Sequence, residues 1–292
     1  MIDWFKNIKN KRNKKFIQID VVNFYPSISE KLLKEALEWA KQFTDISEEE
    51  IDVILKSKDS ILFNEGEPWG KKGGDNFDIA QGSYDGAECA ELVGMFILAD
   101  INSTDTLNPG IYRDDFLAVT SANPQQTENL KKQIVAKFSR YGLGTTAMAN
   151  LKKVDFLDVT LALDDDEYKP YHKPNSVPQY VNNLSNHPPS VLRNIPANIN
   201  KRLSSISSSE KMFEQAAPIY QEAINKSGYD FQLKFDPTAG QNKPQKRLRK
   251  RKVLWFNPPY NSTVSTPIGE LFLKLLDAVA PKTENAPLKT SA

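Results

Sequence analysis

The sequence predicts an α+β fold, in which an antiparallel sheet carries helices on one face and is followed by a helical segment. Three observations predict this class. Short β-branched and aromatic stretches alternate with longer amphipathic stretches in the first part of the chain. Capping and turn residues separate these stretches. Beyond Pro174 the sequence favours helices interrupted by prolines.

The first elements expected are a strand and two capped helices. Residues 15–22 are β-branched and aromatic with an alternating pattern, which is typical of a strand. Two Ser-x-x-Glu capping boxes follow, and each predicts a helix N-terminus. They begin at Ser27 and at Ser47 and predict helices that end near residues 43 and 58.

The middle of the chain predicts a hairpin, a buried helix and a pair of short strands. Gly66 lies between two short apolar stretches, which favours a hairpin at 61–69. Residues 87–100 are almost entirely apolar and small, as in a helix buried on most sides. The two short strands are expected at 110–113 and 116–120.

A further helix and three strands complete this part of the chain. Asn123 followed by proline predicts a helix N-terminus, and Gly142 ends that helix after Tyr141. Strands are expected at about 143–149, 154–163 and 168–172, the last two joined by the acidic turn at 164–167.

The composition limits the classes of protein and of site. The 292 residues are 39% hydrophobic and 26% charged, a balance that allows a buried core. A single cysteine, Cys89, excludes an internal disulfide and a cysteine-based zinc site. No apolar run approaches the roughly 20 residues that span a bilayer, and no secretory signal opens the chain. We therefore expect an intracellular protein with no membrane partner.

The formal net charge of +1 conceals two basic runs. Residues 1–15 hold six basic side chains and one acid, and residues 243–252 hold seven basic side chains and no acid. Such runs favour a polyanionic partner, because each neutralised phosphate releases counterions. A solvated basic linker explains the second run equally well, and a nuclear localisation signal is a further interpretation.

Acidic residues at strand ends suggest a metal site. Asp20 ends the first apolar strand, and Asp114 and Asp115 lie between two later ones. Adjacent aspartates in a tight turn are commonly turn formers only. If the sheet brings all three together, however, their oxygens could hold divalent ions for phosphoryl transfer.

These residues belong to a series of segments that resembles the palm of reverse transcriptases, most closely that of Penelope-like retrotransposon elements. The resemblance covers roughly residues 2–205. The segments, in chain order, are Asp20-Val-Val-Asn-Phe-Tyr25, Gln81-Gly82, Tyr112-Arg-Asp-Asp115, the stretch from Gly142 to Asp158, and the stretch from Lys173 to Arg202.

The resemblance implies a right-hand polymerase palm at 16–173, after a basic N-terminal segment at 1–15. A helical thumb-like region would follow at 174–228, and a loop-rich basic tail at 229–292. Such a protein would transfer deoxynucleotides to a DNA or RNA primer on an RNA template, using two Mg²⁺ ions or Mn²⁺.

The resemblance also implies roles for single residues. Asp20, Asp114 and Asp115 would bind the metals, with the backbone carbonyl of Val21 as a further ligand. Tyr25 would lie beneath the sugar and reject ribonucleotides by a clash with the 2′-hydroxyl; its alternative is a core tyrosine beside Phe24. Gln81 and Gly82 would contact the incoming nucleotide, and Arg113 would support the hairpin or the primer end. Lys152 or Lys153 could protonate the leaving pyrophosphate, and an ordinary surface lysine is an equally good interpretation of each.

Two departures from the family pattern bear on activity. The 19 residues before Asp20 are too few for the fingers subdomain that precedes this motif in reverse transcriptases. Phe116 follows the aspartate pair where glycine is frequent, and could crowd the turn. The alternatives are therefore a truncated, catalytically silent remnant that binds nucleic acid, and an RNA polymerase or other palm-type nucleotidyl transferase, against which Tyr25 argues.

Overall fold

The strand β1 (Lys15–Val21) forms where the sequence predicts it and lies inside a four-stranded sheet. The computed structural model describes residues 1–70, 76–102, 107–240, 260, 263 and 268–279. The strand order is β4-β5-β1-β6, and every neighbouring pair is antiparallel. The other three strands are β4 (Asn108–Tyr112), β5 (Asp115–Thr120) and β6 (Thr145–Leu151).

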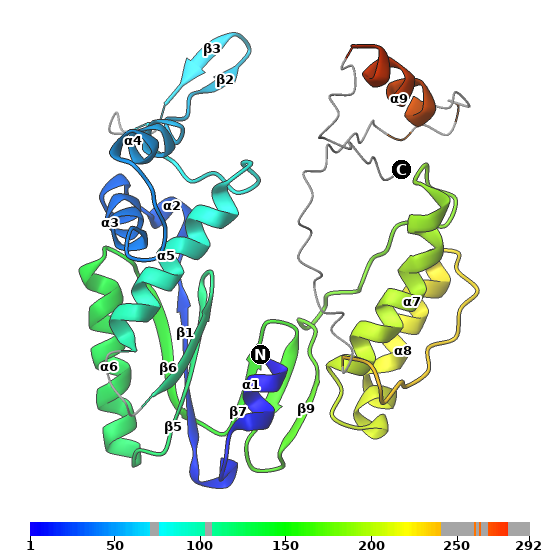
Figure 1. Ribbon diagram of the computed structural model, residues 1–292. Coiled ribbons are helices and arrows are strands. Elements are labelled where there is room, and N and C mark those ends of the chain that lie inside the picture. The colour runs from blue at the N-terminus through cyan, green and yellow to red at the C-terminus, as the bar shows by residue number, and fades with distance from the viewer. Residues whose placement is uncertain (71–75, 103–106, 241–259, 261–262, 264–267, 280–292) are drawn as a thin grey trace. The chain divides into compact units, whose positions relative to one another are not determined.

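Helices pack on one face of this sheet, as predicted (Figure 1). Alternate residues of β1 and β5, such as Ile19 and Phe116, are buried in one core with the helices. Phe116 meets Phe138 edge to face, with ring centroids 6.0 Å apart. The helices that contribute to this core are α2 (Phe24–Ser27), α3 (Glu30–Ala40), α4 (Glu48–Lys56), α5 (Gly86–Ile101) and α6 (Pro124–Arg140).

The opposite face of the sheet is covered at one end of β1. Phe5 of α1 (Ile2–Asn7) stacks on Phe16, with ring centroids 6.5 Å apart. The amide of Gln18 donates a hydrogen bond of 2.7 Å to the carbonyl of Asp155. Asp155 belongs to a second antiparallel sheet, made of β7 (Lys153–Phe156), β8 (Val159–Ala162) and β9 (Glu167–Pro170).

Two of the predicted helix starts are confirmed and one is wrong. Ser47 and Asn123 both form complete capping boxes. The box predicted at Ser27 does not form, because Ser27 ends the short helix α2. Ser29 is the N-cap of α3 instead, and its hydroxyl accepts a hydrogen bond of 3.2 Å from the amide of Leu32.

The single strand predicted at 154–163 is a hairpin. β7 and β8 pair through Phe156 and Val159, which leaves Leu157 and Asp158 as a two-residue loop. Leu157 has a φ of 56°, a conformation that leucine seldom adopts. Neither loop residue is the glycine or asparagine that commonly marks such a turn in a sequence, which is why the sequence predicts one continuous strand here.

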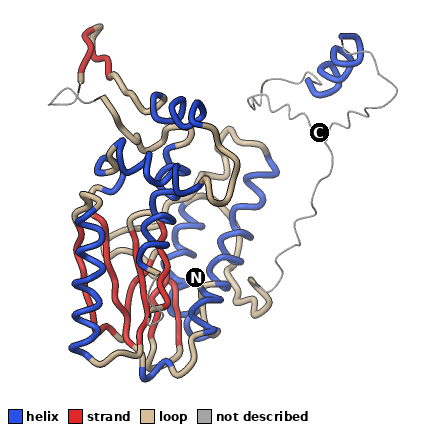
Figure 2. The backbone as a smooth tube through the Cα atoms, turned by 60° about the vertical axis from the view of Figure 1, so that its left-hand side comes forward, coloured by secondary structure: helices blue, strands red, loops and turns tan. Residues whose placement is uncertain are grey.

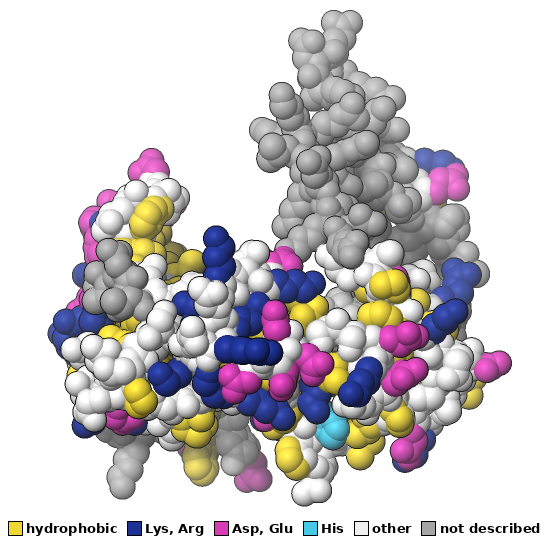
Figure 3. All heavy atoms as spheres, turned by 90° about the horizontal axis from the view of Figure 1, so that it is seen from below, with side chains coloured by type: hydrophobic (Ala, Val, Ile, Leu, Met, Phe, Trp, Pro, Cys, Tyr) yellow, Lys and Arg dark blue, Asp and Glu magenta, His cyan; other side chains and the backbone are white. Residues whose placement is uncertain are grey.

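The N-terminal basic run is partly neutralised by the acidic turn between β8 and β9. Lys11 of the short helix η1 (Lys11–Asn13) forms an ion pair of 2.9 Å with Asp166. The Arg12 Nε donates a hydrogen bond of 3.3 Å to the carbonyl of Asp164 in the same turn. Basic and acidic side chains accordingly lie among one another on the surface in Figure 3. The second basic run, 243–252, lies outside the described residues.

The chain forms two compact units, Met1–Tyr171 and His172–Ala292. The first also carries the predicted hairpin, β2 (Leu62–Asn64) and β3 (Glu67–Trp69). In the second unit α7 (Pro189–Ser205) and α8 (Glu210–Lys226) enclose a small core around Phe213, which confirms the helical segment. The helix α9 (Ile268–Val279) was not predicted. None of the described helices has the length and apolar character needed to cross a membrane.

Candidate active site

Two of the three candidate carboxylates are partners across adjacent strands. Asp20, near the end of β1, pairs with Asp115, the first residue of β5. Directly opposite residues of an antiparallel pair project from the same face, with Cβ atoms about 5 Å apart. That face is opposite the helices, because the buried pair Ile19 and Phe116 is next in register. Asp20 is exposed and Asp115 is half-buried.

Asp114 lies in the turn that joins β4 to β5. Tyr112 pairs with Asp115, so Arg113 and Asp114 form a two-residue loop. The carbonyl of Asp114 accepts a hydrogen bond of 2.9 Å from the amide of Val21. The structure thus brings Asp20, Val21, Asp114 and Asp115 to one end of the two central strands.

The donor set of this strand end fits Mg²⁺ or Mn²⁺. Like charges on directly opposite residues destabilise a sheet, and a bound cation removes that repulsion. Within the described ranges, no group of three or more acidic, histidine or cysteine side chains is already arranged around a metal position. Mg²⁺ does not require one, because it commonly binds one or two carboxylates and completes its octahedron with water and substrate phosphates.

Arg113 has a backbone conformation that its residue type rarely adopts. Its φ is 56°, and its guanidinium lies over the ring of Tyr112, 5.2 Å from the centroid. The Arg113 Nε is buried and has no hydrogen-bond partner within the described part of the chain. Strain of this kind is concentrated at functional sites, so the guanidinium at the tip of the turn is a candidate for contact with a phosphate.

Tyr25 lies in the core. Its side chain is 8% exposed in α2, and its ring meets that of Phe24 edge to face at 6.2 Å. This is the placement expected of the alternative interpretation, a core tyrosine beside Phe24. Its role beneath a nucleotide sugar stays a prediction.

Gln81 and Gly82 lie in an exposed turn before α5. Gly82 has a φ of 92°, which a residue with a side chain would adopt only with strain. In Figure 1 the N-terminal end of α5 lies toward the same end of the sheet as the turn between β4 and β5.

Lys152 is not brought to the carboxylates. Leu151 pairs with Phe16, whereas Thr146 pairs with Asp20, so the register places Lys152 near the opposite end of β1. At about 3.3 Å per residue, Phe16 and Asp20 are roughly 13 Å apart along β1, and Lys152 lies one residue beyond the partner of Phe16. Lys152 is also held there by Asp164 and by the carbonyl of Arg12, while Lys153 is an exposed residue of β7.

Phe116 does not crowd the turn. It is fully buried on the helix face of β5, next to Phe138, while its neighbour Asp115 projects from the other face. The residue that departs from the family pattern therefore strengthens the core beneath the carboxylates.

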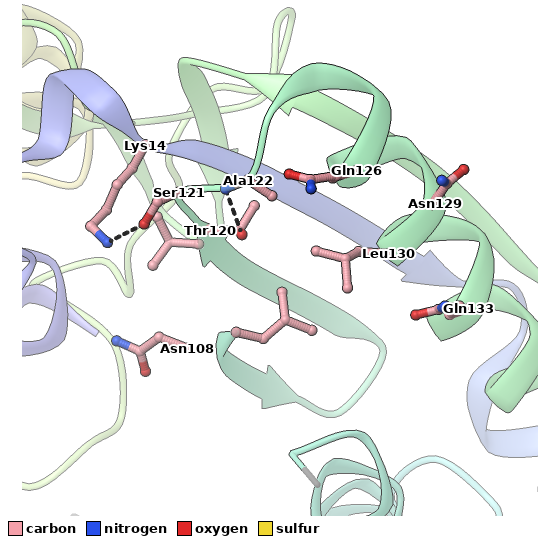
Figure 4. A pocket seen from close by; sticks show the side chains of 11 residues that line it. Lys14, Asn108, Thr120, Ser121, Ala122, Gln126, Asn129, Leu130 and Gln133 are labelled. Carbon is pink, nitrogen blue, oxygen red and sulfur yellow. Dashed lines mark hydrogen bonds between the residues drawn. The ribbon is translucent and has the colours of Figure 1, made fainter. Parts of the chain in front are cut away.

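A hollow at the far end of β5 is separate from this site (Figure 4). It has a volume of about 600 Å³, and its walls come from the first half of α6 and the ends of β4 and β5. The ammonium of Lys14 donates a hydrogen bond of 3.2 Å to the Ser121 hydroxyl at its rim. Thr120 lines it, five positions along β5 from Asp115.

The sequence analysis missed Lys58 and Asp85. The Lys58 ammonium is buried and forms an ion pair with the Asp85 carboxylate, just beyond Gln81 and Gly82. No local pattern marks this pair, because its members are 27 residues apart and Lys58 follows a helix end where an exposed lysine is ordinary.

Solved structures of similar fold are known, although the sequence comparisons find no relative. No family model and no curated protein matches the chain. A structure of telomerase from Candida albicans, in complex with a TWJ fragment of telomeric RNA, matches with a TM-score of 0.53 and 12% identity, over 77% of this chain and 41% of that one. An apo telomerase from Candida tropicalis, truncated from its C-terminal domain, gives 0.45 and 16%, over 58% and 39%. The RNA-dependent RNA polymerase of a human picobirnavirus gives 0.40 and 16%, over 56% and 32%.

The chain spans about two fifths of the length of these telomerases. The antiparallel sheet with helices on one face agrees with the likeness to the Candida albicans structure. The chain has a palm-like α+β fold, similar to that of the Candida albicans telomerase.

Proposed function

We propose that this chain is an RNA-directed DNA polymerase of a retroelement, similar to Penelope-like elements, which adds deoxynucleotides to a primer by a two-metal mechanism. The observation that carries the proposal is the pairing of Asp20 with Asp115 beside the turn that holds Asp114. The order of the sequence motifs and the polymerase-like fold support it.

The residues at the strand end and in the turn before α5 have three kinds of role in this proposal: metal binding, alignment of the strands, and contact with the substrates. Asp20, Asp114 and Asp115 would hold the divalent ions, which when bound stabilise the attacking and leaving oxygens of the transfer. The hydrogen bond between Val21 and Asp114 keeps the two strand ends in register. Arg113 presents a cation to the primer end, and Gly82 allows the backbone to approach the nucleotide closely.

The partners proposed are an RNA template, a DNA or RNA primer and deoxynucleoside triphosphates. The presence of an RNA fragment in the Candida albicans telomerase structure supports an RNA partner for a chain of similar fold. A nuclear location would suit a retroelement polymerase, and the basic run at 243–252 is consistent with it.

Primer extension tests this function. The full chain is supplied with a primed RNA template, deoxynucleotides and either Mg²⁺ or Mn²⁺. Asp114→Ala removes a metal ligand and should abolish incorporation while the circular dichroism spectrum stays unchanged. Asp165→Ala is the matched control, because Asp165 is an exposed aspartate in the turn between β8 and β9 and should leave incorporation unchanged.

Incorporation that survives Asp114→Ala would contradict the metal assignment. A folded wild-type chain that binds the primed template but extends nothing would contradict polymerase activity for this chain. That result would favour the alternative, a remnant that only binds nucleic acid. A preference for ribonucleotides would favour an RNA polymerase.

A further inference from the structure

Lys58 is a buried cation in a protein whose other described lysines are, with the exception of Lys11, at least partly exposed. It follows the C-terminus of α4, and its side chain is 4% exposed. Its ammonium forms an ion pair and hydrogen bond with Asp85, which is 41% exposed and is the N-cap residue of α5. The pair therefore joins the end of one core helix to the beginning of another.

Lys58 holds the segment between these helices at two points. Its backbone carbonyl accepts a hydrogen bond of 2.9 Å from the amide of Asp78, and its ammonium binds Asp85. One residue thus fixes both ends of the stretch 78–85. Gln81 and Gly82, the candidate nucleotide contacts, lie between these two attachments.

The held segment is compact and presents its middle to solvent. Ile79 is fully buried in the core, whereas Gln81 and Gly82 are exposed. The Ser83 hydroxyl donates a hydrogen bond of 2.9 Å to the carbonyl of Ala80, which closes the turn. A Cβ at Gly86 would lie 2.6 Å from that same carbonyl oxygen, so the turn also requires glycine where α5 begins.

A buried ammonium is an expensive way to join two helices, because its desolvation offsets much of the attraction to its partner. A buried ion pair is therefore weak evidence for a role in stability alone. The pair offers something that apolar contact does not, a directed attachment at one point of the loop.

We propose that Lys58 is a positioning residue, which holds Gln81 and Gly82 in place for the incoming nucleotide through its two attachments to the segment 78–85. This inference rests on the proposed polymerase function. It goes beyond that function in assigning the position of the proposed nucleotide-binding turn to an ion pair that includes none of the three candidate carboxylates.

The first test uses amide hydrogen exchange and does not depend on activity. Lys58→Met keeps an unbranched apolar stem and removes the charge, and the half-exposed Asp85 can then be hydrated. Exchange in residues 78–86 should become about tenfold faster, while β1 and β5 remain as protected as in the wild type. Lys56→Met, an exposed lysine two residues earlier, is the matched control and should change neither.

The second test measures primer extension as a function of deoxynucleotide concentration. Misplacement of the turn should raise the KM for deoxynucleotides and lower kcat/KM by up to about 100-fold. The affinity for the primed template should stay unchanged. Asp85→Asn should act in the same direction, and the double variant should be no worse than the more severe single variant, because both remove one interaction.

The outcomes separate this inference from the proposed function. Unchanged exchange in 78–86, or exchange that rises equally in β1, would overturn the positioning role even if the wild-type chain is an active polymerase. An active wild type whose KM does not respond to Lys58→Met would overturn it as well. If the wild type extends no primer, the polymerase proposal fails, and faster exchange confined to 78–86 would still establish the attachment.

Discussion

At the scale of single residues, the strand end around Asp20 combines two features that ordinarily lower stability. Asp20 and Asp115 occupy directly opposite positions of neighbouring strands. Two carboxylates so placed destabilise the sheet by up to about 1 kcal/mol relative to a neutral pair. Arg113 adds a strained backbone at the tip of the same turn. The cation site that we propose at this strand end would account for both costs.

Tyr25 provides a prediction at this scale. Because its ring is buried against Phe24, Tyr25→Ala should lower the free energy of unfolding by about 3 kcal/mol through loss of packing. Tyr25→Phe keeps the ring and should change it by less than about 1.5 kcal/mol. Urea denaturation followed by circular dichroism measures both. Equal stability of Tyr25→Ala and the wild type would show that the ring does not belong to the core.

The candidate residues differ in how far the sequence could predict them. Asp20 and Asp114 each end or adjoin an apolar strand, and the resemblance in motif order predicts a role for them. Lys152 could not be placed, because its position depends on the register of β6 against β1. Lys58 could not be recognised at all, since its burial and its ion pair with Asp85 depend on the tertiary fold and not on the local sequence.

At the scale of elements, the capping motifs predict a helix start correctly where no other helix precedes the motif directly. Ser47 and Asn123 cap helices as predicted. Ser27 fails because the preceding residues form α2, which a motif of four residues does not reveal. The loop of Leu157 and Asp158 lacks the glycine that marks a tight hairpin turn in a sequence, so the two strands are predicted as one. The helix α9 lies inside the stretch predicted as a loop-rich tail.

The two serines before α3 give a direct comparison. Ser29→Ala removes the acceptor for the amide of Leu32 and should cost about 1 kcal/mol of stability. Ser27→Ala should cost less, since Ser27 caps no helix and its hydroxyl makes a single exposed hydrogen bond of 3.3 Å to the carbonyl of Val22. Denaturation midpoints of the two variants, compared with the wild type, measure the difference. A larger loss for Ser27→Ala would place the cap where the sequence motif put it.

At the scale of the whole molecule, the sequence predicted the class of fold because strands, helices and turns each carry local signals that agree with one another. The antiparallel sheet with helices on one face follows from those signals, and the likeness to Candida albicans telomerase supports it. The distribution of charge was predicted less well. Lys11, counted in the N-terminal basic run, is buried and paired with Asp166, so that run offers less free positive charge than its composition indicates.

In the proposed mechanism Asp20 and Asp115 hold a divalent cation together with Asp114. Titration of the full chain with Mn²⁺, in the presence of a deoxynucleoside triphosphate and followed by electron paramagnetic resonance, measures this binding. The wild type and Asp165→Asn should bind Mn²⁺ beyond what the nucleotide alone binds, and Asp20→Asn should lose at least about tenfold in that affinity, because it removes one of the few charged oxygen ligands. Equal binding by Asp20→Asn and the wild type would contradict the assignment of the site.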